Sequence, residues 1–127
     1  MKVLQVIESA YRATLEEQDD TVVWITHAMK GAGASLDVLL RGNAVNYILS
    51  GQDASGLAFG DWRQTQPPQI DHDVAGLIGK GIGVFYVEED AEERGIGNVK
   101  DLVTGVSAVR REGVPALFEQ YDQVWHW

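Results

Sequence analysis

The chain has 127 residues, a formal net charge of −9 and no cysteine. Its length fits one domain over residues 1–127, and 45% apolar with 23% charged residues is the composition of a folded globular protein. The acidic balance excludes a nucleic-acid or anionic-membrane partner, because basic residues supply the affinity for polyanions. Without cysteine there is no disulfide framework, thiolate nucleophile or zinc–thiolate site. No apolar run approaches the ~20 residues that span a bilayer, and none resembles a signal peptide, so we expect a cytoplasmic protein.

The first elements are a strand and a helix. Val3–Ile7 is a compact apolar run, which is typical of a buried parallel strand. A polar, acid-rich connection over residues 10–20 follows it. Asp20 or Thr21 can then cap a helix over Thr21–Gly31 that carries an apolar stripe.

The second strand is followed by a short helix and a long irregular segment. Leu36–Leu40 predicts the strand, and Asn43 is expected to cap a helix over Ala44–Leu49. Gln52–Gln69 has no periodicity and contains glycines and prolines. A loop of this length is usually functional or mobile, so we interpret it as a surface loop or lid.

The third strand leads into an acidic stretch. Asp71 or Asp73 is expected to start a helix that runs through Ile78, and Ile82–Val87 predicts the strand. An acidic helical turn over Asp90–Arg94 follows. Ligands of parallel α/β proteins gather at such carboxyl ends of strands, so this junction is the first candidate for a functional site.

The last part of the chain completes the alternation. Val106–Val109 predicts a short strand, Pro115 begins a helix that runs to about Tyr121, and Gln123–Trp127 predicts a final strand. Strands alternating with helices predict an α/β fold: a single-domain, three-layer α/β/α arrangement with a mostly parallel sheet of about five strands.

Polar residues that follow the first two strands should lie near the acidic stretch, because carboxyl ends of parallel strands share one sheet edge. Arg41 beside these acids is either an ion pair that braces the loop or an anchor for an anion. The candidate set at this edge is Glu8, Ser9, Arg41, Asn43, Val87, Glu88, Glu89 and Asp90.

The carboxylates after the third strand have two interpretations. Crowded carboxylates can bind a hard cation such as Mg²⁺ or Ca²⁺, whereas acids at a helix start also suit the helix dipole in solvent. The second interpretation is preferred, and we predict no metal and no cofactor. The three histidines are scattered along the chain and predict no shared site. The residues concerned are Glu88, Glu89, Asp90, Glu92, Glu93, His27, His72 and His126.

Three segments together resemble the DsrE/DsrF/DsrH-like sulfur-relay family, to which the TusB, TusC and TusD proteins are related. Leu39–Val45 is similar to that family's passage from the second strand into a helix. Val84–Ile96, with its Arg94-Gly95-Ile96 ending, is similar to its strand, functional loop and helix end. Pro115–Trp127 is similar to its last helix and strand. The acidic sequence of the middle segment is most similar to the DsrH/TusB branch, whose members often lack the active cysteine.

The resemblance implies the fold, self-association into trimers, hexamers or mixed complexes, and a place in sulfur trafficking. In catalytic members of the family a cysteine at the end of the strand before the acidic helix carries a persulfide. Val87 stands at that position here. Because persulfide transfer needs a thiolate, we expect no cysteine-based catalysis and no catalytic residue in this chain.

Tryptophans at the chain end and on the first helix suggest a contact with other subunits. Trp125 and Trp127 share one face of the last predicted strand, which either the chain's own helices or another subunit would cover. Trp24 adds apolar surface on the first predicted helix. We therefore assign these three residues to an interface.

Two functions remain open. The preferred one is a non-catalytic DsrE-like subunit or docking protein in intracellular sulfur relay, as a homo-oligomer (trimer or hexamer) or in a hetero-complex with sulfur-relay proteins. The alternative is a small-ligand-binding protein or acid/base enzyme that uses a strand-end pocket near Glu88 and Arg41.

Overall fold

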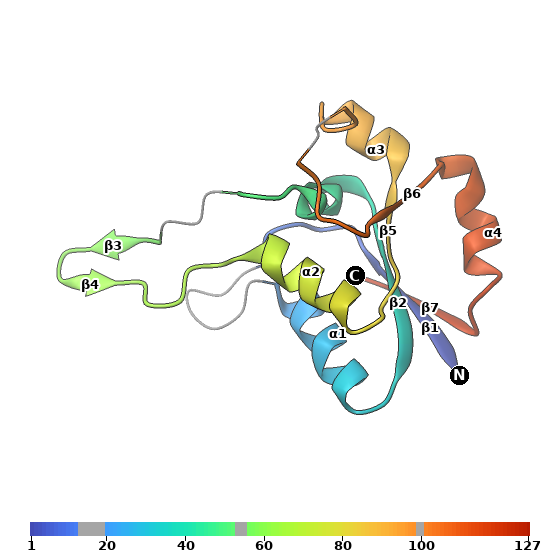
Figure 1. Cartoon of the computed structure of the whole chain (residues 1–127), viewed down its shortest axis with the longest axis horizontal. Helices are drawn as coiled ribbons and strands as arrows, with labels where there is room; N and C mark the ends of the chain where they lie inside the picture. Colours follow the sequence, from blue (N-terminus) through green and yellow to red (C-terminus); the bar gives the residue numbers. More distant parts are fainter. Residues whose placement is uncertain (13–19, 53–55, 99–100) are drawn as a thin grey trace.

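The structure is a computed structural model that describes residues 1–12, 20–52, 56–98 and 101–127. Its centre is a sheet with five strands, all parallel, in the order β6-β5-β2-β1-β7 (Figure 1). The strands are β1 (Lys2–Ile7), β2 (Ser35–Leu40), β5 (Val84–Val87), β6 (Ser107–Val109) and β7 (Gln123–His126). The predicted α/β class is confirmed, and the sheet is wholly parallel.

Three helical elements cover one face of the sheet. They are α1 (Thr21–Gly31), the 3₁₀ helix η1 (Gly42–Ile48) and α2 (Ile70–Gly79). Asp20 begins α1, as predicted, because its Oδ1 accepts hydrogen bonds from the amides of Val22 (2.8 Å) and Val23 (3.0 Å). These helices and the sheet enclose the larger apolar core.

The opposite face is covered by α4 (Val114–Phe118), which follows the 3₁₀ turn η2 (Arg111–Gly113). Val114 and Leu117 of α4 pack on Leu4, Leu39 and Val87 of the sheet in a second, smaller core. The sheet is therefore buried between helices on both faces, which gives the predicted three layers. This double cover explains why its central strands are nearly continuous apolar runs.

Several predicted helix ends are wrong. Asn43 does not cap η1, because Arg41 occupies the cap position and the Asn43 side chain accepts from Arg94 instead. Neither Asp71 nor Asp73 caps α2, which begins at Ile70 with Gln69 before it. The acidic helix α3 (Glu88–Glu93) begins two residues early, directly after β5. Helix α4 stops at Phe118, because Tyr121 turns back and donates to Asp37 Oδ2 (2.6 Å).

The segment predicted as an irregular surface loop or lid contains regular structure. Strands β3 (Ala58–Phe59) and β4 (Trp62–Arg63) form an antiparallel hairpin that projects away from the rest of the protein (Figure 1). Gly60, at φ +58°, opens its two-residue turn, in a conformation that glycine adopts without steric cost. The absence of periodicity misled the prediction, since two-residue strands are too short to show alternation.

Candidate functional site

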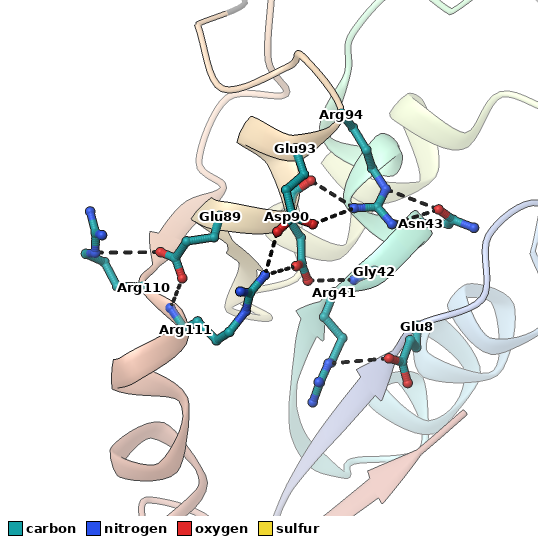
Figure 2. Close-up of polar contacts among 10 residues, drawn as sticks. All are labelled: Glu8, Arg41, Gly42, Asn43, Glu89, Asp90, Glu93, Arg94, Arg110 and Arg111. Carbon is teal, nitrogen blue, oxygen red and sulfur yellow. Dashed lines mark hydrogen bonds and ion pairs between the residues drawn. The ribbon is translucent and has the colours of Figure 1, made fainter.

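The acidic helix α3 lies where the carboxyl ends of β2, β5 and β6 meet (Figure 2). Val87, the last residue of β5, is only 2% exposed and points into the smaller core. Glu88 follows it at once and opens the helix. The strand end therefore presents carboxylates to its surroundings, while the residue at the expected thiolate position is buried and apolar.

Asp90 is the central residue of the site and is 9% exposed. Its Oδ2 accepts a hydrogen bond from the backbone amide of Gly42 (2.8 Å), and its Oδ1 accepts one from Nη2 of Arg111 (2.6 Å). Arg94 donates through Nη1 to the Asp90 carbonyl oxygen (3.0 Å). One side chain thus connects α3 to η1 and to the segment after β6.

These contacts set the charge state of Asp90. Partial burial favours the neutral acid, but the Gly42 amide and the Arg111 guanidinium, with the charge of Arg94, favour the carboxylate more strongly and lower the pKa of Asp90. The reciprocal hydrogen bonds to Asp90 and Glu93 raise the pKa of Arg111. Asp90 is therefore ionised at neutral pH and acts as a structural acceptor rather than as an acid.

Glu88 and Glu89 face the arginine pair that follows β6. The backbone amide of Arg111 donates to Glu89 Oε2 (2.5 Å), and Arg110 lies 3.6 Å from Glu89 Oε1 and 3.7 Å from Glu88 Oε2. Glu89, Arg110, Arg111 and Glu112 line a shallow surface depression. Its walls carry both signs of charge in equal number, so it has no net preference for an anion or a cation.

Asn43 reaches the same site from η1. Its Oδ1 accepts from Nε (3.1 Å) and Nη2 (2.9 Å) of Arg94, which also lies 3.9 Å from Glu93 (Figure 2). Asn43 therefore lies beside Arg94, at the end of α3 opposite to Glu88 and Glu89. Its role is to hold the arginine at the end of α3.

Arg41 does not brace the acidic helix, and this part of the prediction is wrong. Its Nε lies 3.7 Å from Glu8 Oε1, and Oε2 of the same carboxylate lies 2.6 Å from His126 Nε2. Glu8 therefore joins the carboxyl ends of β1, β2 and β7 in a second polar group, next to an exposed Ser9. Because β2 separates β1 and β7 from β5 in the sheet, Glu8 and His126 lie away from α3. Arg41 follows β2, which adjoins both β1 and β5, and its side chain turns to Glu8 on the β1 side.

The three tryptophans assigned to an interface differ in their surroundings. Trp125 packs against the protein's own larger core. Trp24 is 51% exposed and Trp127 is 44% exposed, although Trp127 Nε1 donates to Gln5 Oε1 (2.7 Å). The chain's own helices thus cover part of this surface, and the subunit contact of Trp24 and Trp127 stays a prediction.

Arg110 and Arg111 are the functional residues that sequence reasoning missed. They are the densest basic cluster in the chain and follow the predicted strand Val106–Val109. A parallel strand next to the acidic one would bring its carboxyl end to the same edge, so the signal was present. What the sequence did not supply was the position of that strand beside β5.

Two features are absent from residues 1–12, 20–52, 56–98 and 101–127. No three His, Asp or Glu side chains come together there in a way that could hold a metal ion. Glu88, Glu89 and Asp90 of α3 lie beside arginines instead. Among the described residues, no helix is both long enough and apolar enough to cross a bilayer.

Replacing Gly42 with alanine should destabilise the protein by about 1–2 kcal/mol. Gly42 has φ +56°, and an added Cβ would lie 3.1 Å from Glu8 Cγ. The shift would also disturb the amide that donates to Asp90. Urea unfolding measures the effect, and Gly79→Ala is the matched control, because that helical glycine has nothing within 4 Å of an added Cβ. An equal loss in both variants would contradict the interpretation.

No protein-family model matches the sequence, and no curated protein matches it. Solved structures do share its fold. The ychN protein from E. coli aligns with TM-score 0.75 at 19% identity, over 99% of this chain and 98% of that chain. BT1422 from Bacteroides thetaiotaomicron, a conserved protein of unknown function, aligns with TM-score 0.66 at 12% identity, over 99% and 94%. MTH1491 from Methanobacterium thermoautotrophicum, also of unknown function, aligns with TM-score 0.60 at 17% identity, over 98% and 97%. At these identities the likeness establishes the fold alone.

Proposed function

We propose that this protein is a non-catalytic, DsrE-like docking subunit of an intracellular sulfur-relay assembly. The observation that carries the proposal is Val87, an apolar residue that is 2% exposed where the resembled family places its thiolate. A buried valine can support a contact surface but has no atom that accepts or passes on a persulfide. The family resemblance of Val84–Ile96 supports the sulfur-relay context, and the fold shared over nearly the whole chain with a solved structure supports the architecture only.

The contact surface is the exposed side of α3. Asp90 and Glu89 point inward to arginines, whereas Glu92 and Glu93 are exposed. Five carboxylates on α3 face only three nearby arginines, so the surface stays negative. Because complementary charge steers association, the surface fits a partner with a basic patch around its own reactive cysteine.

The test is affinity capture of the tagged protein from its native lysate, with mass spectrometry for a co-purifying protein that carries a persulfidated cysteine. We compare wild type with Glu92→Gln/Glu93→Gln, which removes two exposed charges from α3. The matched control is Asp101→Asn/Glu119→Gln, which removes two exposed charges elsewhere. We expect wild type and control to retain the partner and the α3 variant to lose it several-fold.

Two results would count against this function. If only the protein's own chain is recovered, the proposed docking partner is contradicted. Equal recovery of a persulfide carrier by the α3 variant and by wild type would move the contact away from α3.

A second candidate rests on the group formed by Glu8, Arg41 and His126. The Glu8–His126 contact of 2.6 Å, beside Arg41 at 3.7 Å, places an acid/base pair next to a cation at three strand ends. Such a group could hold a small anionic ligand and move a proton. Thermal shift with organic acids, nucleotides and coenzyme A derivatives tests it, and His126→Gln should abolish any stabilisation that wild type shows.

A further inference from the structure

We infer that the projecting hairpin is a self-association arm that pairs with the same hairpin of a second copy of this chain. The arm is defined as residues Leu57–Arg63. This inference concerns a surface distinct from α3 and does not depend on the docking role proposed above.

The arm exposes apolar side chains that its own domain does not cover. Every residue from Gly56 to Arg63 is exposed, with Leu57 at 51%, Phe59 at 65% and Trp62 at 40%. Phe59 and Trp62 face each other across the two strands, and their rings stack with centroids 5.9 Å apart. An isolated two-stranded hairpin is marginal in water, so an arm of this kind gains most from a partner that covers these rings.

The arm also has free edges for backbone pairing. In the part of the chain that the structure describes, β3 and β4 form a sheet of two strands, so each has a neighbour on one side only. A strand edge with unpaired amide and carbonyl groups is a template for pairing with another strand. Figure 1 shows the hairpin standing away from the domain, where another chain can reach it.

The charges of the arm favour a second copy of this chain as the partner that pairs with it. The chain carries a net charge of −9, but the arm contains one acid, Asp61, and one base, Arg63, on either side of Trp62. If two β4 strands pair antiparallel about Trp62, each Asp61 lies beside Arg63 of the second copy. This gives two identical ion pairs, as a two-fold interface requires. Strand β3 carries no charge, so its edge provides no such match.

The side-chain faces fit this arrangement. Neighbouring residues in a strand point to opposite sides, so Arg63 lies on the face away from Trp62, whose ring stacks on Phe59. Asp61, the second residue of the turn, directly precedes β4. Pairing would therefore place four aromatic rings in one row, on the face opposite Arg63. Trp62 would meet Trp62 of the second copy at the two-fold axis.

The first test measures molecular mass by sedimentation over two orders of magnitude of protein concentration. Because the arm contact is two-fold, we expect Phe59→Ser/Trp62→Ser to have half the mass of the wild-type assembly at concentrations where that assembly is complete. At concentrations where the wild type is a single chain, the melting temperature should be unchanged, because both side chains are exposed there. Ile25→Ser, which alters a similarly exposed apolar residue (38%) on α1, is the matched control and should keep the wild-type mass.

The second test uses charge reversal. Asp61→Arg places two arginines side by side at each ion pair, and Arg63→Asp places two aspartates there, so each variant alone should show the halved mass. An equal mixture of the two variants should recover the full mass, because arginines of one chain then meet aspartates of the other. The double variant Asp61→Arg/Arg63→Asp should also recover it.

Three outcomes would overturn the inference. One is a wild type that is monomeric at every concentration. Another is an assembly whose mass no arm variant changes, which would place the interface elsewhere. The third is failure of the mixed charge variants to recover the mass that each loses alone, which would exclude antiparallel β4 pairing.

Discussion

Replacing Asp90 with asparagine should lower the free energy of unfolding at pH 7 by about 2–4 kcal/mol. The asparagine keeps the shape but loses the charge that accepts from Arg111 at 2.6 Å, and its amide group would face that guanidinium or the Gly42 amide. The site is 9% exposed, so water replaces these contacts poorly. Urea denaturation at fixed pH measures the loss.

Glu93→Gln is the matched control for this experiment. Glu93 lies 3.3 Å from the same guanidinium, but its side chain is 61% exposed. Exposed ion pairs contribute about 0–1 kcal/mol, so the control should change stability little. Equal effects of the two substitutions would show that burial of Asp90 does not matter and would contradict its central role.

The stability difference between wild type and Asp90→Asn should also depend on pH. The pKa of Asp90 is lower in the folded protein than in the unfolded chain, so its stabilisation is complete above the unfolded pKa of about 4 and is lost as pH falls through the folded pKa. The stability difference between wild type and Asp90→Asn should therefore be constant near neutrality and shrink below about pH 4. A difference that stays constant down to pH 2 would contradict the assignment.

Removing the Asp20 side chain should cost about 2–4 kcal/mol of stability. Asp20 is 1% exposed, caps α1 through two backbone amides, and accepts a hydrogen bond from the Tyr47 hydroxyl at 2.5 Å. Burial and this hydrogen bond raise the pKa of Tyr47, so its hydroxyl remains a donor at neutral pH. Asp20→Ala removes the cap and leaves that hydroxyl, on a fully buried side chain, without its acceptor.

A double-mutant cycle separates the two contributions. Tyr47→Phe removes the hydroxyl and should cost less than Asp20→Ala, because the α1 cap survives. The combination Asp20→Ala/Tyr47→Phe should cost less than the sum of the single variants, by about 0.5–3 kcal/mol, since each single variant already breaks the shared contact. Strict additivity in urea denaturation would contradict the coupling.

Features that depend on residues close together in the chain could be predicted from the sequence, whereas features that depend on distant residues could not. Asp20 was identified as a cap because the amides that it binds lie two and three residues away. Val87 was placed at a buried strand end because the apolar run before it is continuous. The arm was missed because its strands have two residues each, which is too short for alternation to show.

The sequence by itself determined the alternation of strands and helices, the parallel α/β class, and the absence of a thiolate at the strand end. These properties depend on apolar periodicity and residue type, which can be read from short stretches of the sequence. The tertiary structure decided which charges pair. Order β6-β5-β2-β1-β7 places the arginines after β6 beside β5 and its carboxylates, while it puts β2 between β1 and β5. Arg111 therefore meets Asp90, and Arg41, which follows the strand between β1 and β5, pairs with Glu8. Lateral strand order is set by packing between segments far apart in the chain, so no local pattern encodes it.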